Sequence, residues 1–444
     1  MPQIVSTKEL SEEAAPRAAS PCGKLMVLGG SNCQLHALQR AKERGLYTVL
    51  ADYTQNPPGK AFADRHCLIS TFDADACIRA AKDESVDGVL CVGTDQPVLT
   101  AARVADALHL PSPLSVPEAY AVTNKRRMKQ VFQDARIQTP AFCFLTEDER
   151  FLDLAGHETA FTLQPPYVIK PLDSQGQRGV FKVHTKEELF CRLPETLSFS
   201  AEDCCLVEEF YESDEITISA WLSDGVFYPL SVTDRIHYPD PTHIGVCTGH
   251  RYPSIHIDRY DDILALCQKT AKAFHIQNGP FYFQVLSGSR GLLAGEIACR
   301  IGGAFEDVTI PVLTGFPFMD AAMDLALNIP PVTPARLTKK QLENNRAFVL
   351  LLFCSPGTIA FITPEEELLA LPFVADCGYN YGVGDCIPVM QNATARFGHA
   401  VLFGEEDTIA AHVRTFLDTL HVTDTNGRDL LERFVVDRRY LEGE

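Results

Sequence analysis

The sequence predicts a protein of mixed class, with a parallel, doubly wound α/β domain at the N-terminus and a strand-rich α+β region after it. Short apolar runs alternate with helical patterns as far as about residue 118, which is typical of a parallel sheet covered by helices on both faces. Further along, strand patterns follow one another around tight turns, as in antiparallel meanders. The composition, 46% hydrophobic and 22% charged, is that of a folded globular chain.

The net charge excludes nucleic acid and anionic membranes as expected partners, and the cysteine pattern indicates the compartment. The 444 residues include 39 basic and 58 acidic side chains, a net charge of −19. So acidic a chain binds nucleic acid and anionic membranes poorly, and neither is expected as a partner. No apolar run reaches the length of a membrane span. The 15 cysteines are scattered without a C-x-x-C pair, which favours reduced thiols in the cytoplasm.

The N-terminal domain is expected at residues 23–118, after a flexible tail at 1–22. Apolar runs ending at glycine or polar residues predict its strands, and the periodic segments between them predict its helices. The expected strands are 24–30, 47–52, 66–70 and 88–93, and the expected helices follow at about 35–45, 74–82 and 96–110.

A glycine turn at Gly29-Gly30, with Asp52 about 20 residues later, invites comparison with nicotinamide-binding motifs. Cys33 stands where that fingerprint needs another glycine. We therefore interpret the turn as a site where helix packs on sheet, and keep a nicotinamide oxidoreductase as an alternative of another class.

The middle region is expected to be α+β. One helix is predicted over 119–135, carrying a basic cluster that includes Lys125. The predicted strands are 167–171, 180–183, 204–210, 216–222 and a hairpin of 279–286 with 292–300. Pro330-Pro331 marks a boundary, after which 347–354 is strand-like and 407–420 helical.

A polar, glycine-containing loop follows the strand that carries Lys170. Glycines allow backbone amides to approach phosphate oxygens, and basic side chains supply charge. A hairpin with an exposed arginine is the alternative. The loop residues concerned are Ser174, Gly176, Gln177, Arg178 and Gly179.

Acidic and amide side chains at strand ends are the candidate sugar and metal ligands. Glu208 and Glu209 close an apolar strand, and Glu215 lies seven residues after Glu208; solvated surface acids are the alternative. Gln284 and Glu296 lie on the two arms of the predicted hairpin, where oxygen ligands can hold Mg²⁺ against a polyphosphate. Arg300 is four residues past Glu296 and shares its strand face, where it can meet negative charge developing in a reaction.

Three histidines, His237, His243 and His250, are separated by prolines and a glycine. No helical face aligns them, so a loop near the substrate is preferred to a zinc site.

Together these segments resemble the ATP-grasp superfamily, in the branch of carbamoyl-phosphate synthetase-like, biotin carboxylase-like and L-amino-acid ligase proteins. The resemblance lies in the order of the motifs and covers about residues 24–330. The motifs are Asn124-Lys125, Val168-Ile-Lys170-Pro171, the loop 174–179, Val207-Glu-Glu209-Phe210 with Glu215, Gln284, and Glu296-Ile-Ala-Cys-Arg300.

The resemblance implies a pre-ATP-grasp domain at 23–118, an ATP-grasp domain at 119–330 with a lid at about 137–207, and a further C-terminal α+β domain at 331–444. It implies a Mg²⁺-dependent ligase, with Mn²⁺ as an alternative ion, that uses ATP. Such an enzyme activates a small-molecule carboxylate as an acyl phosphate and joins it to an amine.

The resemblance also implies a role for each motif residue. Lys125 and Lys170 contact the ATP phosphates under the Ser174–Gly179 lid loop. Glu208, Glu209 and Phe210 lie beside the adenine, and Glu215 on the ribose. Gln284 and Glu296 hold Mg²⁺. Arg300, together with Lys170, acts on the acyl phosphate or the tetrahedral intermediate.

Two positions depart from the family pattern. Ala298 stands where asparagine is common, and Gln284 where an acid is common, so one ligand and one negative charge are missing. Ala298 keeps open the alternative of an ATP-binding protein without catalysis. A purine-pathway ligase or carboxylase of the same fold is a further alternative. Substrate contacts are expected around Thr94-Asp95, in the loop 237–251 and near Arg300; a homodimer is considered because dimers are the commonest soluble oligomers.

One C-terminal motif completes the resemblance. Arg396-Phe-Gly398-His399, followed by Val401-Leu-Phe-Gly404 and a helical pattern, is similar to the strand–turn–helix near the end of these ligases.

Overall fold

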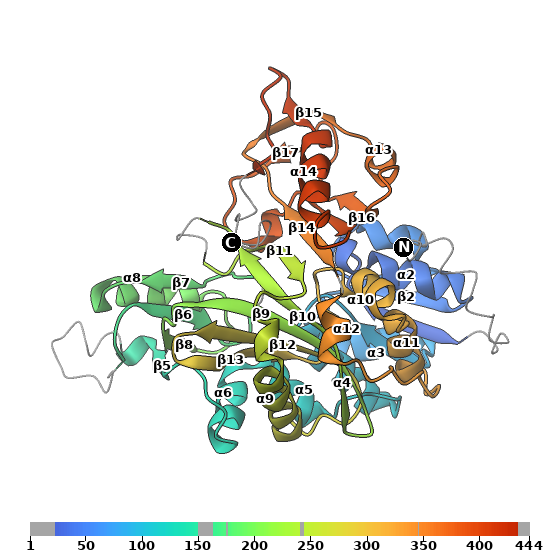
Figure 1. The fold of residues 1–444 in the computed structure, drawn as a ribbon. Helices are drawn as coiled ribbons and strands as arrows, with labels where there is room; N and C mark the ends of the chain where they lie inside the picture. The colour runs from blue at the N-terminus through green and yellow to red at the C-terminus, as the bar shows by residue number, and fades with distance from the viewer. Residues whose placement is uncertain (1–22, 150–162, 175, 240–243, 345, 434–444) are drawn as a thin grey trace.

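The computed structural model describes residues 23–149, 163–174, 176–239, 244–344 and 346–433 (Figure 1). The predicted tail at 1–22 and part of the predicted lid, 150–162, lie outside the described residues. Within the described ranges, no helix combines the length and the apolar character that a bilayer crossing needs.

The N-terminal domain contains the predicted parallel sheet, with strand order β3-β2-β1-β4. Side chains of β1 alternate between two cores: Leu25 and Val27 pack with α2, whereas Met26 and Leu28 pack with α3 and α4. Both faces are therefore covered, as the doubly wound prediction requires. The elements are β1 (Lys24–Leu28), α2 (Asn32–Glu43), β2 (Tyr47–Asp52), η1 (Pro58–Phe62), β3 (Arg65–Leu68), α3 (Ala74–Glu84), β4 (Gly88–Cys91) and α4 (Pro97–Leu108).

The single helix predicted over 119–135 is wrong. The chain forms α5 (Val116–Thr123) and α6 (Lys125–Asp134), separated at Asn124. Asn124 is extended, with φ −110° and ψ 118°, and its side chain accepts a hydrogen bond from the Arg127 amide. This N-cap replaces helix continuation, because the asparagine side chain satisfies a backbone donor that would otherwise be unpaired.

A small antiparallel sheet with the order β5-β8-β6-β7 forms one lobe of the middle region. Helix α8 (Lys186–Leu197) buries Leu189, Phe190 and Leu193 against it. The strands are β5 (Phe142–Thr146), β6 (Tyr167–Pro171), β7 (Phe181–Val183) and β8 (Cys204–Glu209).

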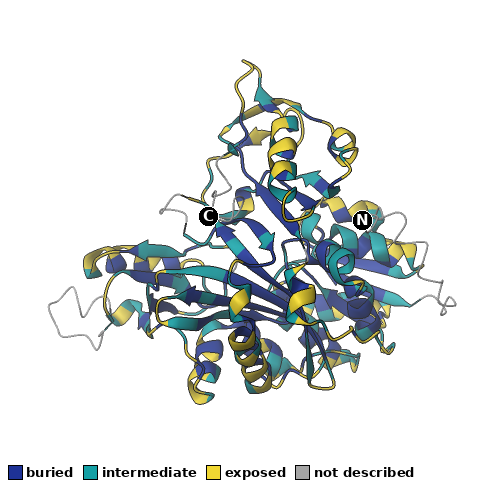
Figure 2. Ribbon diagram, in the orientation of Figure 1, coloured by how far each residue is buried: buried dark blue, intermediate teal, exposed yellow. Residues whose placement is uncertain are grey.

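A large eight-stranded sheet, order β13-β12-β9-β10-β11-β14-β18-β16, forms the other lobe. Most residues of its central strands are buried, its two edge strands are half-buried in large part, and the helices around it expose their outer sides (Figure 2). The strands are β9 (Ser213–Ser223), β10 (Val226–His237), β11 (Cys247–Tyr252), β12 (Gly279–Gly288), β13 (Gly291–Ala298), β14 (Ala347–Leu352), β16 (Val374–Tyr379) and β18 (Gly398–Phe403).

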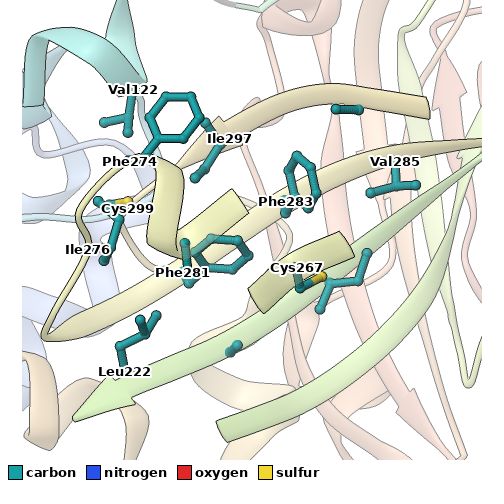
Figure 3. Packing of buried hydrophobic residues seen from close by; sticks show 14 of the residues in the cluster. Val122, Leu222, Cys267, Phe274, Ile276, Phe281, Phe283, Val285, Ile297 and Cys299 are labelled. Atoms are coloured by element: carbon teal, nitrogen blue, oxygen red, sulfur yellow. The ribbon is translucent and has the colours of Figure 1, made fainter. Parts of the chain in front are cut away.

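One face of the large sheet is the main hydrophobic core. Phe281 and Phe283 of β12 pack against Phe274 and other apolar side chains from α5, α6 and α9 (Tyr260–Ala273), as Figure 3 shows. Because side chains alternate along a strand, the intervening residues Tyr282 and Gln284 point to the opposite face, which is free to line a cleft.

The remaining helices and strands include α11 (Phe318–Ala326), which packs against the first domain. Helix α11 packs Met319 and Met323 into the core that β1 and α2 share. The predicted boundary after residue 330 stays a prediction, and β14 beyond it pairs with β11 before it. The elements are η3 (Ile257–Arg259), α10 (Glu306–Thr314), α11 (Phe318–Ala326), α12 (Lys339–Glu343), β15 (Gly357–Ile362), α13 (Glu365–Leu369), β17 (Cys386–Ile387), η4 (Ala393–Ala395), α14 (Ile409–Thr419) and β19 (Val422–Asp424).

Candidate active site

A cleft of about 1220 Å³ opens between the small sheet, the large sheet and the carboxyl ends of the parallel strands. It collects the site residues that the sequence predicts, with Gly179 as the exception. The predicted residues that line it are Lys125, Lys170, Ser174, Gly176, Gln177, Arg178, Glu208, Glu209, Phe210, Glu215, Gln284, Glu296 and Arg300.

Lys170 and Glu208 face each other from neighbouring strands of the small sheet. Lys170 Nζ lies 2.7 Å from Glu208 Oε2, and Lys129 of α6 lies 2.5 Å from Glu208 Oε1. Burial opposes the charged form of Glu208, but the two lysines overcome it and lower its pKa to about 2. Burial likewise opposes the charge of Lys170, and the carboxylate of Glu208 outweighs it and raises the lysine pKa. Lys170 is therefore a fixed positive charge at the edge of the cleft.

Lys125 connects the first turn of α6 to the predicted metal ligands. Its Nζ lies 3.3 Å from Glu296 Oε1 and donates to the Ser174 carbonyl at 3.3 Å. The strand register passes from Phe283 opposite Ile297 to Val285 opposite Ala294, so Gln284 stands opposite the Gly295–Glu296 pair. Two oxygen-bearing side chains and a lysine thus meet at one point.

Glu215 lies in a second charged group on the large sheet. Arg235 Nη1 is 3.3 Å from Glu215 Oε2, and His237 Nε2 is 2.8 Å from the same oxygen. Burial raises the carboxyl pKa, but Arg235 and the contact with His237 outweigh it and lower the pKa to about 2. Glu215 is an ionised acceptor at the wall of the cleft.

Arg300 follows β13 and reaches across to the first domain. Its Nη2 lies 2.5 Å from Asp95 Oδ1, and its guanidinium lies 4.5 Å from the centre of the Tyr282 ring. Its Nε is buried and has no hydrogen-bond partner within the part of the chain that the structure describes. The arginine is held in place and keeps an unused donor, which suits it to an anionic ligand.

The loop 174–179 needs its glycines, although Gln175 lies outside the described residues. Gly176 and Gly179 both adopt φ +70°, a conformation that other residues seldom take. A Cβ on Gly179 would lie 2.7 Å from Phe199. The loop is thus held against Phe199 on one side while its other residues line the cleft.

At the far end of the small sheet, Phe210 lies under a lysine. Lys182 Nζ is 3.4 Å from the centre of the Phe210 ring. The side chain of Glu209 accepts a hydrogen bond from the Gln164 amide at 3.0 Å. A flat apolar ring beside polar backbone is a surface on which a nucleobase can stack.

Sequence reasoning missed Lys129 and Arg235 as site residues. Lys129 lies in the basic cluster of the helix predicted over 119–135. It is four residues after Lys125, and this helical spacing indicates that both side chains lie on one side of α6. Arg235 gave no sequence signal, because only the strand register places it opposite Glu215.

His237 and His250 both line the cleft, but each has a partner of its own. His250 is buried and lies 3.1 Å from Thr233 Oγ1, and burial lowers its pKa to about 3. His237 pairs with Glu215, and His243 lies outside the described residues. Searched over the described part of the chain, no group of three or more His, Cys, Asp or Glu side chains is placed to hold a metal.

Asp52 accepts hydrogen bonds from the backbone around it. Its Oδ2 accepts from the Gly30 amide at 2.8 Å and its Oδ1 from the Thr54 amide at 2.6 Å. These bonds give the carboxylate a structural role in holding the glycine turn, as the packing interpretation of that turn expects.

The unpaired polar atoms test whether a magnesium nucleotide suits this cleft. Among the described residues, Ser174 Oγ, Arg300 Nε and Arg396 Nε are buried without hydrogen-bond partners, and all three residues line the cleft. Lysines and arginines with unused donors match polyphosphate oxygens. Gln284 and Glu296 supply the one or two protein oxygens that Mg²⁺ typically takes beside substrate phosphates. The residues present fit both groups.

The chain is similar to known proteins in sequence and in fold. No protein-family model matches the chain. Dapdiamide A synthase of Enterobacter agglomerans is 22% identical over 313 residues, 64% of this chain and 68% of that protein.

Solved structures share the whole architecture. L-amino acid ligase from Bacillus licheniformis superposes with a TM-score of 0.75 at 19% identity, covering 92% of this chain and 100% of that chain. The biotin carboxylase domain of the 2-oxoglutarate carboxylase from Hydrogenobacter thermophilus, solved with MgADP and bicarbonate, gives 0.73 at 15% identity over 95% of both chains. The predicted fold class is confirmed.

Proposed function

Because this chain has the ATP-grasp fold, we propose that it is an ATP-dependent carboxylate–amine ligase. It activates a small-molecule carboxylate as an acyl phosphate, which an amine then attacks, with release of ADP and phosphate. The similarity to Dapdiamide A synthase and to an L-amino acid ligase supports this class of reaction.

One observation carries the proposal: a single cleft brings together phosphate-binding cations, candidate metal ligands and a buried arginine. Lys125 and Lys170 come from α6 and β6, Gln284 and Glu296 from β12 and β13, and Arg300 from the chain after β13. These segments are far apart in the sequence, and their charged side chains meet only in the folded chain.

Each residue then has a defined task. Lys125 and Lys170 neutralise phosphate oxygens, and Gln284 and Glu296 hold Mg²⁺, which neutralises charge on the phosphates. Arg300 stabilises negative charge on the acyl phosphate or the tetrahedral intermediate. Phosphoryl transfer depends mainly on positioning and charge neutralisation, so these groups suffice without a covalent nucleophile.

The nucleotide is proposed to lie with its adenine beside Glu208, Glu209 and Phe210 and its ribose on Glu215. The loop Ser174–Gly179 covers the phosphates and excludes water, which would otherwise hydrolyse the intermediate. We further propose that Mn²⁺ can replace Mg²⁺, that the enzyme works in the cytoplasm, and that it forms a homodimer.

A substrate screen coupled to ADP release tests the proposal. Purified protein with Mg-ATP is incubated with pairs of small carboxylic acids and amines, including amino acids. We expect ADP release that requires both partners of one pair. Mg-ATP binding with no ADP release for any pair would instead support the non-catalytic alternative.

A further inference from the structure

Arg396 is an arginine of the cleft to which the proposed function gives no role. Arg396 lines the cleft from the C-terminal part of the chain, between η4 and β18. Its Nε is buried, and among the described residues it has no hydrogen-bond partner.

Four other cationic side chains that line the cleft each have an acidic partner. Lys125 pairs with Glu296, Lys170 with Glu208, Arg235 with Glu215 and Arg300 with Asp95. Within the described ranges no acidic side chain lies within ion-pair distance of Arg396. Arg396 is half-buried as a residue, but its buried Nε donor is costly to leave without an acceptor unless a ligand supplies one.

Arg396 adds positive charge close to the buried His250. Burial lowers the pKa of His250 on β11, and the charges of Arg235 and Arg396 act in the same direction. Because Glu215 already neutralises Arg235, the charge of Arg396 remains uncompensated at this point. Such a place attracts an anion.

The position of Arg396 next to the lid loop indicates which anion. The Ala393 amide donates to the Gly176 carbonyl at 3.3 Å, so the segment that carries Arg396 touches the loop proposed to cover the phosphates. Its own backbone is fixed: Asn380 Nδ2 donates to the Arg396 carbonyl at 2.8 Å, and the next residue, Phe397, is fully buried. The guanidinium is therefore presented to the cleft by a rigid support.

We propose that Arg396 binds oxygens of the phosphoryl group that this enzyme transfers, so that the C-terminal segment completes the phosphate site. This inference rests on the proposed function and adds to it a residue of the C-terminal motif to which the resemblance assigns no role. A planar guanidinium presents two parallel N–H donors to a pair of oxygens in a fixed geometry, whereas a lysine ammonium acts as a point charge with rotatable donors.

The test measures nucleotide binding by the full-length protein with Arg396→Gln. Calorimetry with Mg-AMP-PNP and with Mg-ADP separates the terminal phosphoryl group from the rest of the nucleotide. We expect the Kd of Mg-AMP-PNP to rise at least tenfold and that of Mg-ADP to change less than threefold. Phosphate titrated into the Mg-ADP complex should also bind at least tenfold more weakly, and Arg396→Lys should lie between the variant and the wild type.

Arg346→Gln is the matched control. Within the described residues, Arg346 also has a buried Nε without a hydrogen-bond partner. It lies directly before β14 and does not line the cleft. Its replacement should therefore leave both Kd values unchanged. Equal Kd values for Mg-AMP-PNP in wild type and Arg396→Gln, or equal losses for AMP-PNP and ADP, would overturn the inference. If the wild type binds no Mg-ADP, it is the proposed function that fails.

Discussion

Replacing Glu208 with glutamine is expected to destabilise the protein strongly at neutral pH. The side chain is 6% exposed and lies between Lys129 and Lys170. Its pKa falls from 4.5 to about 2, and at roughly 1.4 kcal/mol per pH unit this corresponds to about 3 kcal/mol of stability. Removing one partner from a buried ion pair costs about 3–5 kcal/mol, which is the same magnitude.

The pH dependence follows from the sign of the shift. The folded-state pKa lies below the unfolded one, so this stability is fully present above about pH 5 and is lost as the pH falls from 4.5 towards 2. The difference between wild type and Glu208→Gln should therefore be largest at pH 7 and less than about half as large at pH 3.

Urea unfolding followed by far-UV circular dichroism across this pH range measures the difference. Glu209→Gln is the control, because the neighbouring glutamate is half-exposed and its loss should cost no more than about 0.5 kcal/mol. A loss below about 1 kcal/mol for Glu208→Gln at pH 7, or a difference that does not narrow in acid, would refute the reasoning.

Three further predictions concern activity. Arg300→Ala should keep the Kd of Mg-ATP within about threefold and lower substrate-dependent ADP release by about 100-fold or more, because the arginine acts on charge that develops during the reaction; an unchanged rate in the coupled assay would remove its role. Lys170→Ala and Glu296→Ala should each abolish ADP release, whereas Arg192→Ala, on the outer side of α8, should not; wild-type rates in both variants would contradict the assignment. Chelation by EDTA should stop ADP release and added Mg²⁺ should restore it, since Gln284 and Glu296 offer oxygen ligands for this ion; activity that persists in EDTA would exclude the proposed metal site.

Much of the fold could be predicted because its signals are local. Buried parallel strands such as 24–28 and 47–52 are continuous apolar runs, and helices follow them at regular spacing. The break between α5 and α6 was missed because it depends on a single capping asparagine, Asn124, within an otherwise helical pattern.

The candidate site was predictable only where its chemistry is tied to a short motif. Lys170 and Glu296 stand on strands with recognisable neighbours, and the structure brings both to one cleft. The pairing of Arg235 with Glu215 depends on strand register, and the position of Arg396 depends on the packing of the C-terminal segment. Local sequence periodicity predicts neither the pairing of Arg235 with Glu215 nor the position of Arg396.

A crystal structure of the full chain with Mg-AMP-PNP tests the central claim most directly. The account predicts the triphosphate within hydrogen-bond distance of Lys125 and Lys170, with the metal between Gln284 and Glu296 and its phosphates. A nucleotide bound at the Gly29–Gly30 turn instead, with Lys170 and Glu296 making no contact to it, would contradict the account.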